Sequence, residues 1–216
     1  MIQSLTVEQV IEMMVFVSRN IIDKQEDLNE ADRFIGDGDH GNSMALGFNA
    51  VQSMLNDNPS ETVADTFKQI GNAFISSVGG CAGIIFGTFF LSGSKAIDGQ
   101  PVLNSKNFAL FLDASLTAII KRGGAQAGDK TMIDTLQPAA KAAYQSKDFP
   151  LQTSLQRISE SAFKGMESTK LMLSKTGRSK TYGEKTLGFL DPGSITTYLI
   201  FKYMVDFVFD LDQDSF

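Results

Sequence analysis

The sequence predicts an all-α fold, in which about eight antiparallel amphipathic helices form a closed bundle or barrel. Three observations support this prediction. Apolar residues recur at three- and four-residue steps almost throughout, the segments between helices are mostly short, and no convincing run of strands remains. Short connections make consecutive helices antiparallel. No Pro- or Ser-rich linker divides the 216 residues, so we expect one domain over residues 1–216.

The first three helices are predicted from their start and stop signals. The first runs from residue 7 to about 28, behind Thr6 and Gln9, which have the spacing of a capping box. The second runs from about 42 to 55 and ends before "NDNPSE", whose asparagines and proline break a helix. The third follows from about 60 to 78. Helices with an apolar stripe of this kind are expected to pack against a core.

The remaining five helices are predicted from the same signals. The fourth covers about residues 82–97, the fifth 108–119, the sixth ends near residue 144, the seventh covers 151–173, and the eighth starts at 191. The first of these five carries hardly a charge, as expected of a helix that is buried on most sides. Asp129 or Thr131 is the expected N-cap of the sixth helix. The eighth starts with Asp191 as its cap and Pro192 in its first turn, where the missing N–H of proline is harmless.

Composition and charge narrow the class of protein. The chain is 43% hydrophobic, has a formal net charge of −6 and gathers its 19 Lys and Arg into no dense run, so nucleic acid is not an expected partner. The single cysteine, Cys81, excludes an intrachain disulfide and favours a reducing cytoplasm. The N-terminus has no signal-peptide pattern, and no stretch reaches the roughly 18 uninterrupted apolar residues of a membrane span. We therefore expect a cytoplasmic protein with no membrane partner.

Residues suited to binding gather in four segments between helices: "DRFIGDGDHGNS", "SVGGCAG", "KRGGAQAGDKTM" and "TGRSKTYGEKTLGFLDPGS". These segments follow the first, third, fifth and seventh predicted helices. In an up-and-down bundle, alternate connections lie at the same end. We therefore expect all four segments to face one site.

Three aspartates in the first segment, Asp32, Asp37 and Asp39, are candidate metal ligands. Neighbouring carboxylates repel one another unless a partner offsets their charge. Helix capping plus an exposed turn is the structural alternative. A calcium loop is excluded, because Asn42 stands where its glycine belongs and Phe48 where its bidentate glutamate belongs. Magnesium fits, since it is held by a few carboxylates and completes its coordination with waters and substrate phosphates.

His40, the only histidine, follows these carboxylates at the start of the second predicted helix. It can serve as a turn residue, a general base or a hydrogen-bond donor to phosphate, and we favour the last. The N–H groups of Gly41, Asn42 and Ser43 lie at a helix start, which favours an anion. The "VGGCAG" segment offers further amides, with close helix packing as its structural alternative, and it matches neither a Walker loop nor a dinucleotide fingerprint. Cys81 within it is either a loop residue or a buried core residue.

Four motifs, taken together, are similar to one known family: "IGDGDHGNSM", "SSVGG" followed by "GTFF", "GDKTM", and "GE" through "DPG". They span nearly the whole chain. On these motifs the chain resembles the ADP-binding L subunit (DhaL) of dihydroxyacetone kinase, which is equivalent to the C-terminal domain of the single-chain ATP-dependent kinases. A kindred fatty-acid kinase domain usually has threonine after its two aspartates, so His40 favours the sugar-kinase branch.

The resemblance implies an eight-helix antiparallel barrel with the nucleotide site on the loops at one end. It implies that Asp32, Asp37 and Asp39 hold two Mg²⁺ that bridge the phosphates of ADP or ATP. The nucleotide contacts that it implies are His40, Gly41, Asn42, Ser43, Cys81 and Ala82 at the phosphates, Gly123 and Met132 at the adenosine end, and Arg178, Asp191, Pro192 and Gly193 elsewhere. No residue is assigned as a catalytic nucleophile, because phosphoryl transfer needs mainly charge neutralisation and in-line positioning.

The resemblance also implies partner chains. In the family the sugar lies on a separate K subunit, held covalently by a histidine there. In the bacterial phosphotransferase-linked version a phosphohistidine protein, the M subunit, rephosphorylates the bound ADP. We therefore expect phosphate transfer to dihydroxyacetone, or a related short ketose, on a K subunit. The alternative is a non-catalytic regulatory paralogue that docks on a transcription factor or a sugar-binding protein.

Three departures from the family pattern bear on the site. "CAGI" stands where the family usually has Ala-Ser-Gly-Pro, which removes a hydroxyl that would face phosphate. The family usually has asparagine directly before the methionine that ends the first motif, but in "GNSM" Ser43 holds that position and Asn42 stands one residue earlier. The last segment, "GRSKTYGEKT", differs from the common Arg-Ala-Ser-Tyr form. The lost hydroxyl favours the non-catalytic alternative, whereas the three aspartates favour metal-dependent transfer.

Overall fold

The computed structural model describes residues 1–213 of the chain. Within this range it is built almost entirely from helices, together with one two-stranded ladder. The elements are β1 (Ser4–Leu5), α1 (Val7–Ile22), α2 (Gln25–Arg33), α3 (His40–Asp57), α4 (Val63–Ser77), α5 (Gly80–Ala96), β2 (Leu103–Asn104), α6 (Ser105–Gly123), α7 (Met132–Gln145), α8 (Leu151–Ser168), the 3-10 helices η1 (Thr169–Leu171) and η2 (Arg178–Thr186), and α9 (Pro192–Gln213).

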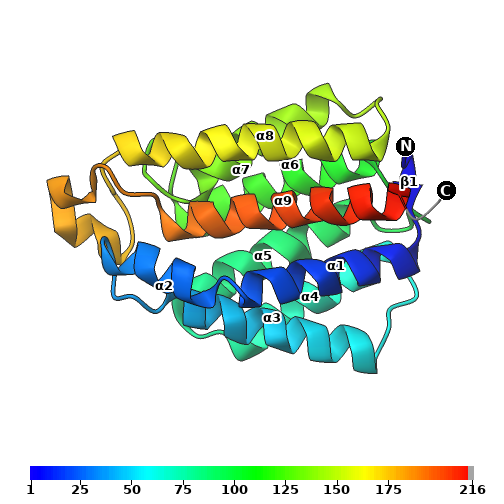
Figure 1. Ribbon diagram of the computed structural model, residues 1–216, viewed down its shortest axis with the longest axis horizontal. Helices are drawn as coiled ribbons and strands as arrows, with labels where there is room; N and C mark the ends of the chain where they lie inside the picture. The colour runs from blue at the N-terminus through cyan, green and yellow to red at the C-terminus, as the bar shows by residue number, and fades with distance from the viewer. Residues whose placement is uncertain (214–216) are drawn as a thin grey trace.

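The helices lie nearly parallel to one long axis and alternate in direction (Figure 1). Consecutive helices from α3 to α9 pack against one another, and α9 also packs on α1, which closes the arrangement into a barrel-like bundle. The predicted all-α antiparallel fold is therefore confirmed. Both ends of the described chain lie at one end of the bundle, and the segment before α9 lies beyond α2 at the opposite end (Figure 1).

Two predicted helices end earlier than their apolar pattern indicates. The helix expected over residues 7–28 breaks at Asp23 and Lys24, so that α2 is a separate helix. The helix expected to reach residue 173 ends at Ser168 and continues as η1. Most predicted caps are present: Thr6 with Gln9 forms the capping box, and Thr131, not Asp129, caps α7. The break after α1 matters for function, because α2 carries an acidic residue to the end of the bundle.

One continuous apolar core runs along the bundle axis and includes residues of all nine α-helices in the described range. Its centre is aromatic: the rings of Phe67 and Phe111 lie 4.7 Å apart, and those of Phe89 and Phe90 lie 4.8 Å apart. Such pairs add to the free energy gained by burial. The helix predicted to be buried on most sides, α5, contributes Phe86, Phe89 and Phe90 to this core, but the prediction is wrong for its other face, where Ile84 is 40% exposed. Among residues 1–213 no helix has the length and apolar character needed to cross a membrane.

Candidate functional site

Three aspartates converge at the end of α2. Asp32 lies in its last turn, and Asp37 and Asp39 lie in the following loop of residues 34–39, which we name the aspartate loop. One oxygen from each carboxylate lies within 4.8 Å of the other two. Asp32 is half-buried, whereas Asp37 and Asp39 are exposed. Because Mg²⁺ is held by a small set of such hard oxygen ligands, these residues fit the cation expected from the sequence.

Asp32 also orders the aspartate loop. Its Oδ2 accepts hydrogen bonds from the backbone N–H of Asp39 at 3.0 Å and of His40 at 3.2 Å, and so satisfies donors at the start of α3. The Gly36 N–H donates to the Asp32 carbonyl at 2.6 Å. A Cβ at position 36 would collide with the Asp32 carboxylate. The loop therefore wraps closely around Asp32, and only glycine leaves room for it.

Two side chains from the segment before α9 reach the aspartate loop. The guanidinium of Arg178 forms an ion pair with Asp37 and lies 3.5 Å from Asp39. The Tyr182 hydroxyl donates to the Gly36 carbonyl at 2.9 Å. Arg178, expected among the nucleotide contacts, thus lies against the candidate metal ligands. Sequence reasoning did not single out Tyr182, whose only signal was its place in the fourth polar segment.

His40 begins α3 with its imidazole packed into the protein. Its Nε2 lies 2.8 Å from Thr196 Oγ1, and its ring centroid lies 6.4 Å from that of Phe86. Although the side chain keeps some contact with solvent, burial lowers the pKa of His40 to about 4, against the opposing effect of the Asp32 charge. The ring is therefore neutral at pH 7, with one nitrogen as donor and the other as acceptor. So weak a base suits hydrogen bonding to phosphate better than proton transfer.

Some of the amides expected to bind phosphate are already engaged within the protein. The Asn42 N–H donates to Asn29 Oδ1 at 3.1 Å, and Asn42 Oδ1 accepts from Asn29 Nδ2 and Gln25 Nε2. The Ser43 N–H donates to the Asp39 carbonyl at 3.0 Å. Among residues 40–43, the Gly41 N–H donates to no acceptor in the part of the chain that the structure describes. Asn42 therefore joins α3 to α2, and of these amides the one on Gly41, a buried residue, is left without a described acceptor.

The glycine turn, residues 79–82, precedes α5. Gly79 occupies the N-cap position without a side-chain cap, and Gly80 has a left-handed φ of +69°. Cys81 is exposed and Ala82 is half-buried, so the core alternative for Cys81 is wrong. The first amides of a helix lack intrahelical acceptors. This turn therefore presents amides without intrahelical acceptors, and further along α5 the ring of Phe86 contacts that of His40 at the start of α3.

The third polar segment, residues 121–132, is fastened by hydrogen bonds at the start of α7. Asp134 accepts from the Gly128 N–H at 2.5 Å and from the Thr131 N–H at 2.8 Å. Gly123 is exposed, with the tip of Ile85 3.5 Å from where its Cβ would be. Met132 is only 6% exposed, so little of it can meet an adenosine.

Lys130 is a buried cation that joins three segments. Its Nζ donates to the carbonyls of Thr169 and Phe189, each at 2.6 Å, and the residue is 1% exposed. Burial lowers the pKa of the Lys130 ammonium, whereas the charges of Asp191 and Asp134 oppose this shift. Sequence reasoning missed Lys130 because nothing in "GDKTM" shows that the lysine points inward.

The start of α9 lies against the start of α7. Asp191 caps α9 by accepting from the Ser194 N–H at 2.7 Å, and the Ser194 hydroxyl donates to the Thr131 carbonyl at 2.7 Å. Burial raises the pKa of Asp191 to about 6, a shift that its hydrogen bonds from Ser194 oppose. Pro192 is buried and Gly193 half-buried. Asp191 and Pro192 are therefore engaged in the structure of the helix start, and Gly193 keeps some exposure.

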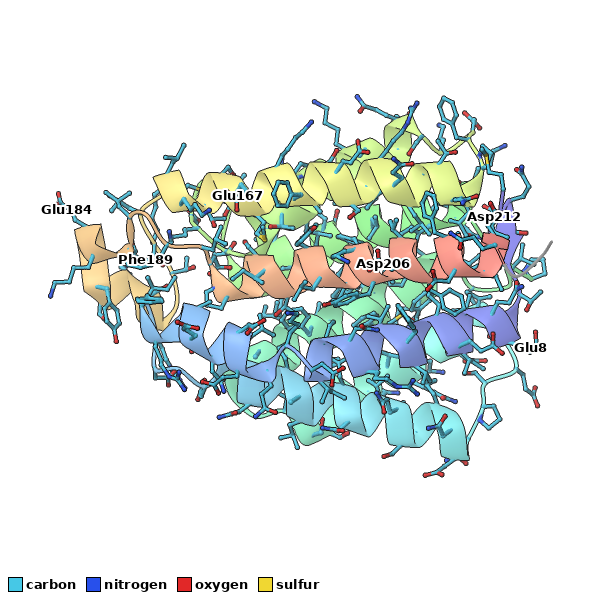
Figure 2. The ribbon with its side chains drawn as sticks, in the orientation of Figure 1. Glu8, Glu167, Glu184, Phe189, Asp206 and Asp212 are labelled. Carbon is cyan, nitrogen blue, oxygen red and sulfur yellow. The ribbon has the colours of Figure 1, made fainter. Side chains whose placement is uncertain are left out.

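The polar segments meet at one end of the bundle, as the helix order predicts. Arg178 joins the fourth segment to the first, and the bond from Ser194 to Thr131 joins it to the third. Figure 2 shows Glu184 and Phe189 at this end, opposite Glu8 and Asp212. Carboxylates that can hold a cation therefore lie beside helix starts that favour anions, an arrangement suited to a metal–phosphate ligand.

Comparison with known proteins agrees with this geometry. A family model described as the DAK2 domain matches residues 34–206. The chain is 35% identical over 180 residues to the ADP-binding subunit DhaL of PEP-dependent dihydroxyacetone kinase 1 from Listeria innocua, with 82% of this chain and 85% of that protein covered. It is 33% identical over 184 residues to the corresponding Escherichia coli subunit, with 84% and 87% covered.

A solved structure shows the same fold. The crystal structure of the dihydroxyacetone kinase from C. freundii in complex with AMP-PNP and Mg²⁺ matches with a TM-score of 0.75 and 27% sequence identity. The match covers 95% of this chain and 35% of that chain. The family resemblance of the four motifs is therefore confirmed, and the fold is found in a longer kinase chain.

Proposed function

Because the chain belongs to the DAK2 domain family, we propose that it is the nucleotide-carrying subunit of a dihydroxyacetone kinase. It binds ADP or ATP with Mg²⁺ and transfers phosphate to dihydroxyacetone, or a related short ketose, on a separate sugar-binding subunit. The observation that carries the proposal is the convergence of Asp32, Asp37 and Asp39 beside the start of α3. The similarity to ADP-binding subunits over most of both chains supports it.

Different residues hold the cations and the phosphates of the nucleotide. Asp32, Asp37 and Asp39 hold two cations. Bound cations would neutralise phosphate charge and so assist phosphoryl transfer. The Gly41 amide, the neutral His40 ring and the amides of the glycine turn donate hydrogen bonds to phosphate oxygens. Each of these groups is a fixed donor, so it needs little reorganisation during transfer.

Partner chains supply the phosphate donor and the sugar-binding site. The names of the relatives include the words PEP-dependent, which supports a phosphohistidine protein as the phosphate donor that recharges the bound ADP. Apolar side chains are exposed around the site: Leu171 is 86% exposed, Phe34 is 48% exposed, and Leu187 and Tyr182 are also exposed. Exposed apolar groups of this kind favour contact with another protein. We place the sugar-binding subunit on this rim, and all partners in the cytoplasm.

Reconstitution tests the proposal. The chain is mixed with the sugar-binding and phosphohistidine subunits of a related PEP-dependent kinase, and formation of dihydroxyacetone phosphate is measured with PEP or with ATP. We expect product only when the sugar-binding subunit is present. Asp39→Asn should abolish it, whereas Asp57→Asn, an exposed aspartate at the far end of α3, should not. Phosphorylation of free dihydroxyacetone by this chain alone would show that the sugar site is misplaced.

A further inference from the structure

Residues 177–186 form a short strap across the aspartate loop. The strap starts at Gly177, with φ of +64°, and kinks at Gly183, with φ of +55°. In Figure 1 it is the orange segment beyond α2, at the same end as the aspartate loop. Two left-handed glycines are what allow so short a segment to leave the bundle, turn and come back.

The strap is fixed at its base and lightly held at its tip. At the base, Thr186 is fully buried and its hydroxyl accepts from the Ser174 N–H at 3.2 Å. At the tip, the residues from Lys180 to Lys185 are exposed. The polar contacts that join the strap to the aspartate loop, among the described residues, are the ion pairs of Arg178 and the hydrogen bond of Tyr182 to Gly36.

Arg178 occupies the same carboxylates that a cation needs. Its guanidinium lies against Asp37 and Asp39, and their side chains are 47% and 56% exposed. A divalent cation bound to these oxygens and a guanidinium in contact with them would repel each other. An exposed ion pair of this kind is weak enough for a divalent cation to displace.

We infer that the strap competes with the cation: in the absence of metal, Arg178 and Tyr182 hold it closed on the aspartate loop, and a divalent cation displaces Arg178 and frees the tip. The competition presupposes the cation site proposed above. Displacement leaves the guanidinium beside the metal, where the phosphates of a nucleotide are the next anions within reach. Cation binding thereby prepares Arg178 for the nucleotide.

Manganese titration in the absence of nucleotide tests the competition. Free Mn²⁺ is followed by electron paramagnetic resonance at constant ionic strength for wild type, Arg178→Gln and Lys180→Gln. Lys180 is the matched control, because it is a cation of the same strap that forms no ion pair with a described carboxylate. We expect Arg178→Gln to bind Mn²⁺ about two- to fivefold more tightly, the range of an exposed ion pair, and Lys180→Gln to change little.

Three results would overturn the inference in distinguishable ways. If Arg178→Gln binds Mn²⁺ no more tightly than wild type, Arg178 does not compete. If Lys180→Gln tightens binding equally, the effect is one of general charge. If neither wild type nor Arg178→Gln binds Mn²⁺ without nucleotide, no competition exists; the same titration repeated with ADP then decides whether the proposed function fails as well.

Proteolysis tests the closed strap without relying on affinity. Trypsin can cut after Lys180 and Lys185, and cleavage after Lys147, at the other end of the bundle, serves as the internal reference. In EDTA, Tyr182→Phe, which loses only the hydroxyl donor, should be cut in the strap faster than wild type. Saturating Mn²⁺ should speed strap cleavage in wild type as well. A strap cut at the same rate in Tyr182→Phe, or protected by Mn²⁺, would contradict the inference.

Discussion

Replacing Lys130 by methionine should destabilise the protein, because this lysine joins the third polar segment to η1 and to the residues before α9. The substitution keeps most of the side-chain volume, so the cavity it creates is small. It removes two 2.6 Å hydrogen bonds and leaves the carbonyls of Thr169 and Phe189 without their donor. An unsatisfied buried carbonyl costs about 1–3 kcal/mol.

The net loss is smaller than the sum of two such costs. The folded protein no longer has to bury an ammonium, and the hydrogen bond to the Phe189 carbonyl is only partly buried. We therefore expect a loss of about 2 kcal/mol in the free energy of unfolding, which lowers the Tm of a chain of this length by roughly 4–8 °C. Urea denaturation and calorimetry measure both, with Lys141→Met, an exposed lysine of α7, as the control. A Lys130→Met protein as stable as the control would refute the role of Lys130 as a buried anchor.

Three further predictions concern titration and access. Because the folded pKa of His40 is about 4 and the imidazole is the only one in the chain, its NMR signals should stay nearly unchanged from pH 8 to pH 6; a midpoint near 6.5 would contradict its burial. The folded pKa of Asp191 is about 6 instead of 3.8, so between these values the folded state binds more protons and stability falls as pH rises, by at most about 3 kcal/mol. Asp191→Asn should flatten this fall in urea titrations from pH 4 to pH 7, and parallel profiles for the two proteins would argue against the shift. Alkylation of the exposed Cys81, followed by intact-mass spectrometry, should slow in saturating Mg·ADP; an unchanged rate would remove the glycine turn from the site.

Local signals were enough to predict the helices and their order, except for the separate helix α2. Thr6 and Asp191 are capping residues whose partners lie three residues ahead, so both caps are visible in the sequence and both form. The break at Asp23 and Lys24 is different. Neither residue is a helix breaker, and the α1 apolar pattern continues through them to Leu28. Packing of α2 against α3, which no local pattern reveals, accompanies this break.

The site could be predicted in outline and not in its internal contacts. Carboxylates at Asp32, Asp37 and Asp39 are close in the chain, so their convergence needs only one turn of loop. The engagement of Asn42 with α2, the inward direction of Lys130 and the reach of Tyr182 to Gly36 depend on segments far apart in sequence. Such contacts follow from the tertiary arrangement, which composition and periodicity do not specify.

The most direct measurement of the central claim is calorimetric titration of ADP into nucleotide-stripped protein, with Mg²⁺ or with EDTA. Wild type and Asp57→Asn should bind in Mg²⁺ and lose binding in EDTA. Asp37→Asn should remain folded and bind at least about tenfold more weakly, since even the loss of a group that only supports a metal ligand typically has an effect of that size. Equal binding of Mg·ADP by Asp37→Asn and wild type, or equal binding in EDTA, would contradict a nucleotide site built on the aspartate cluster.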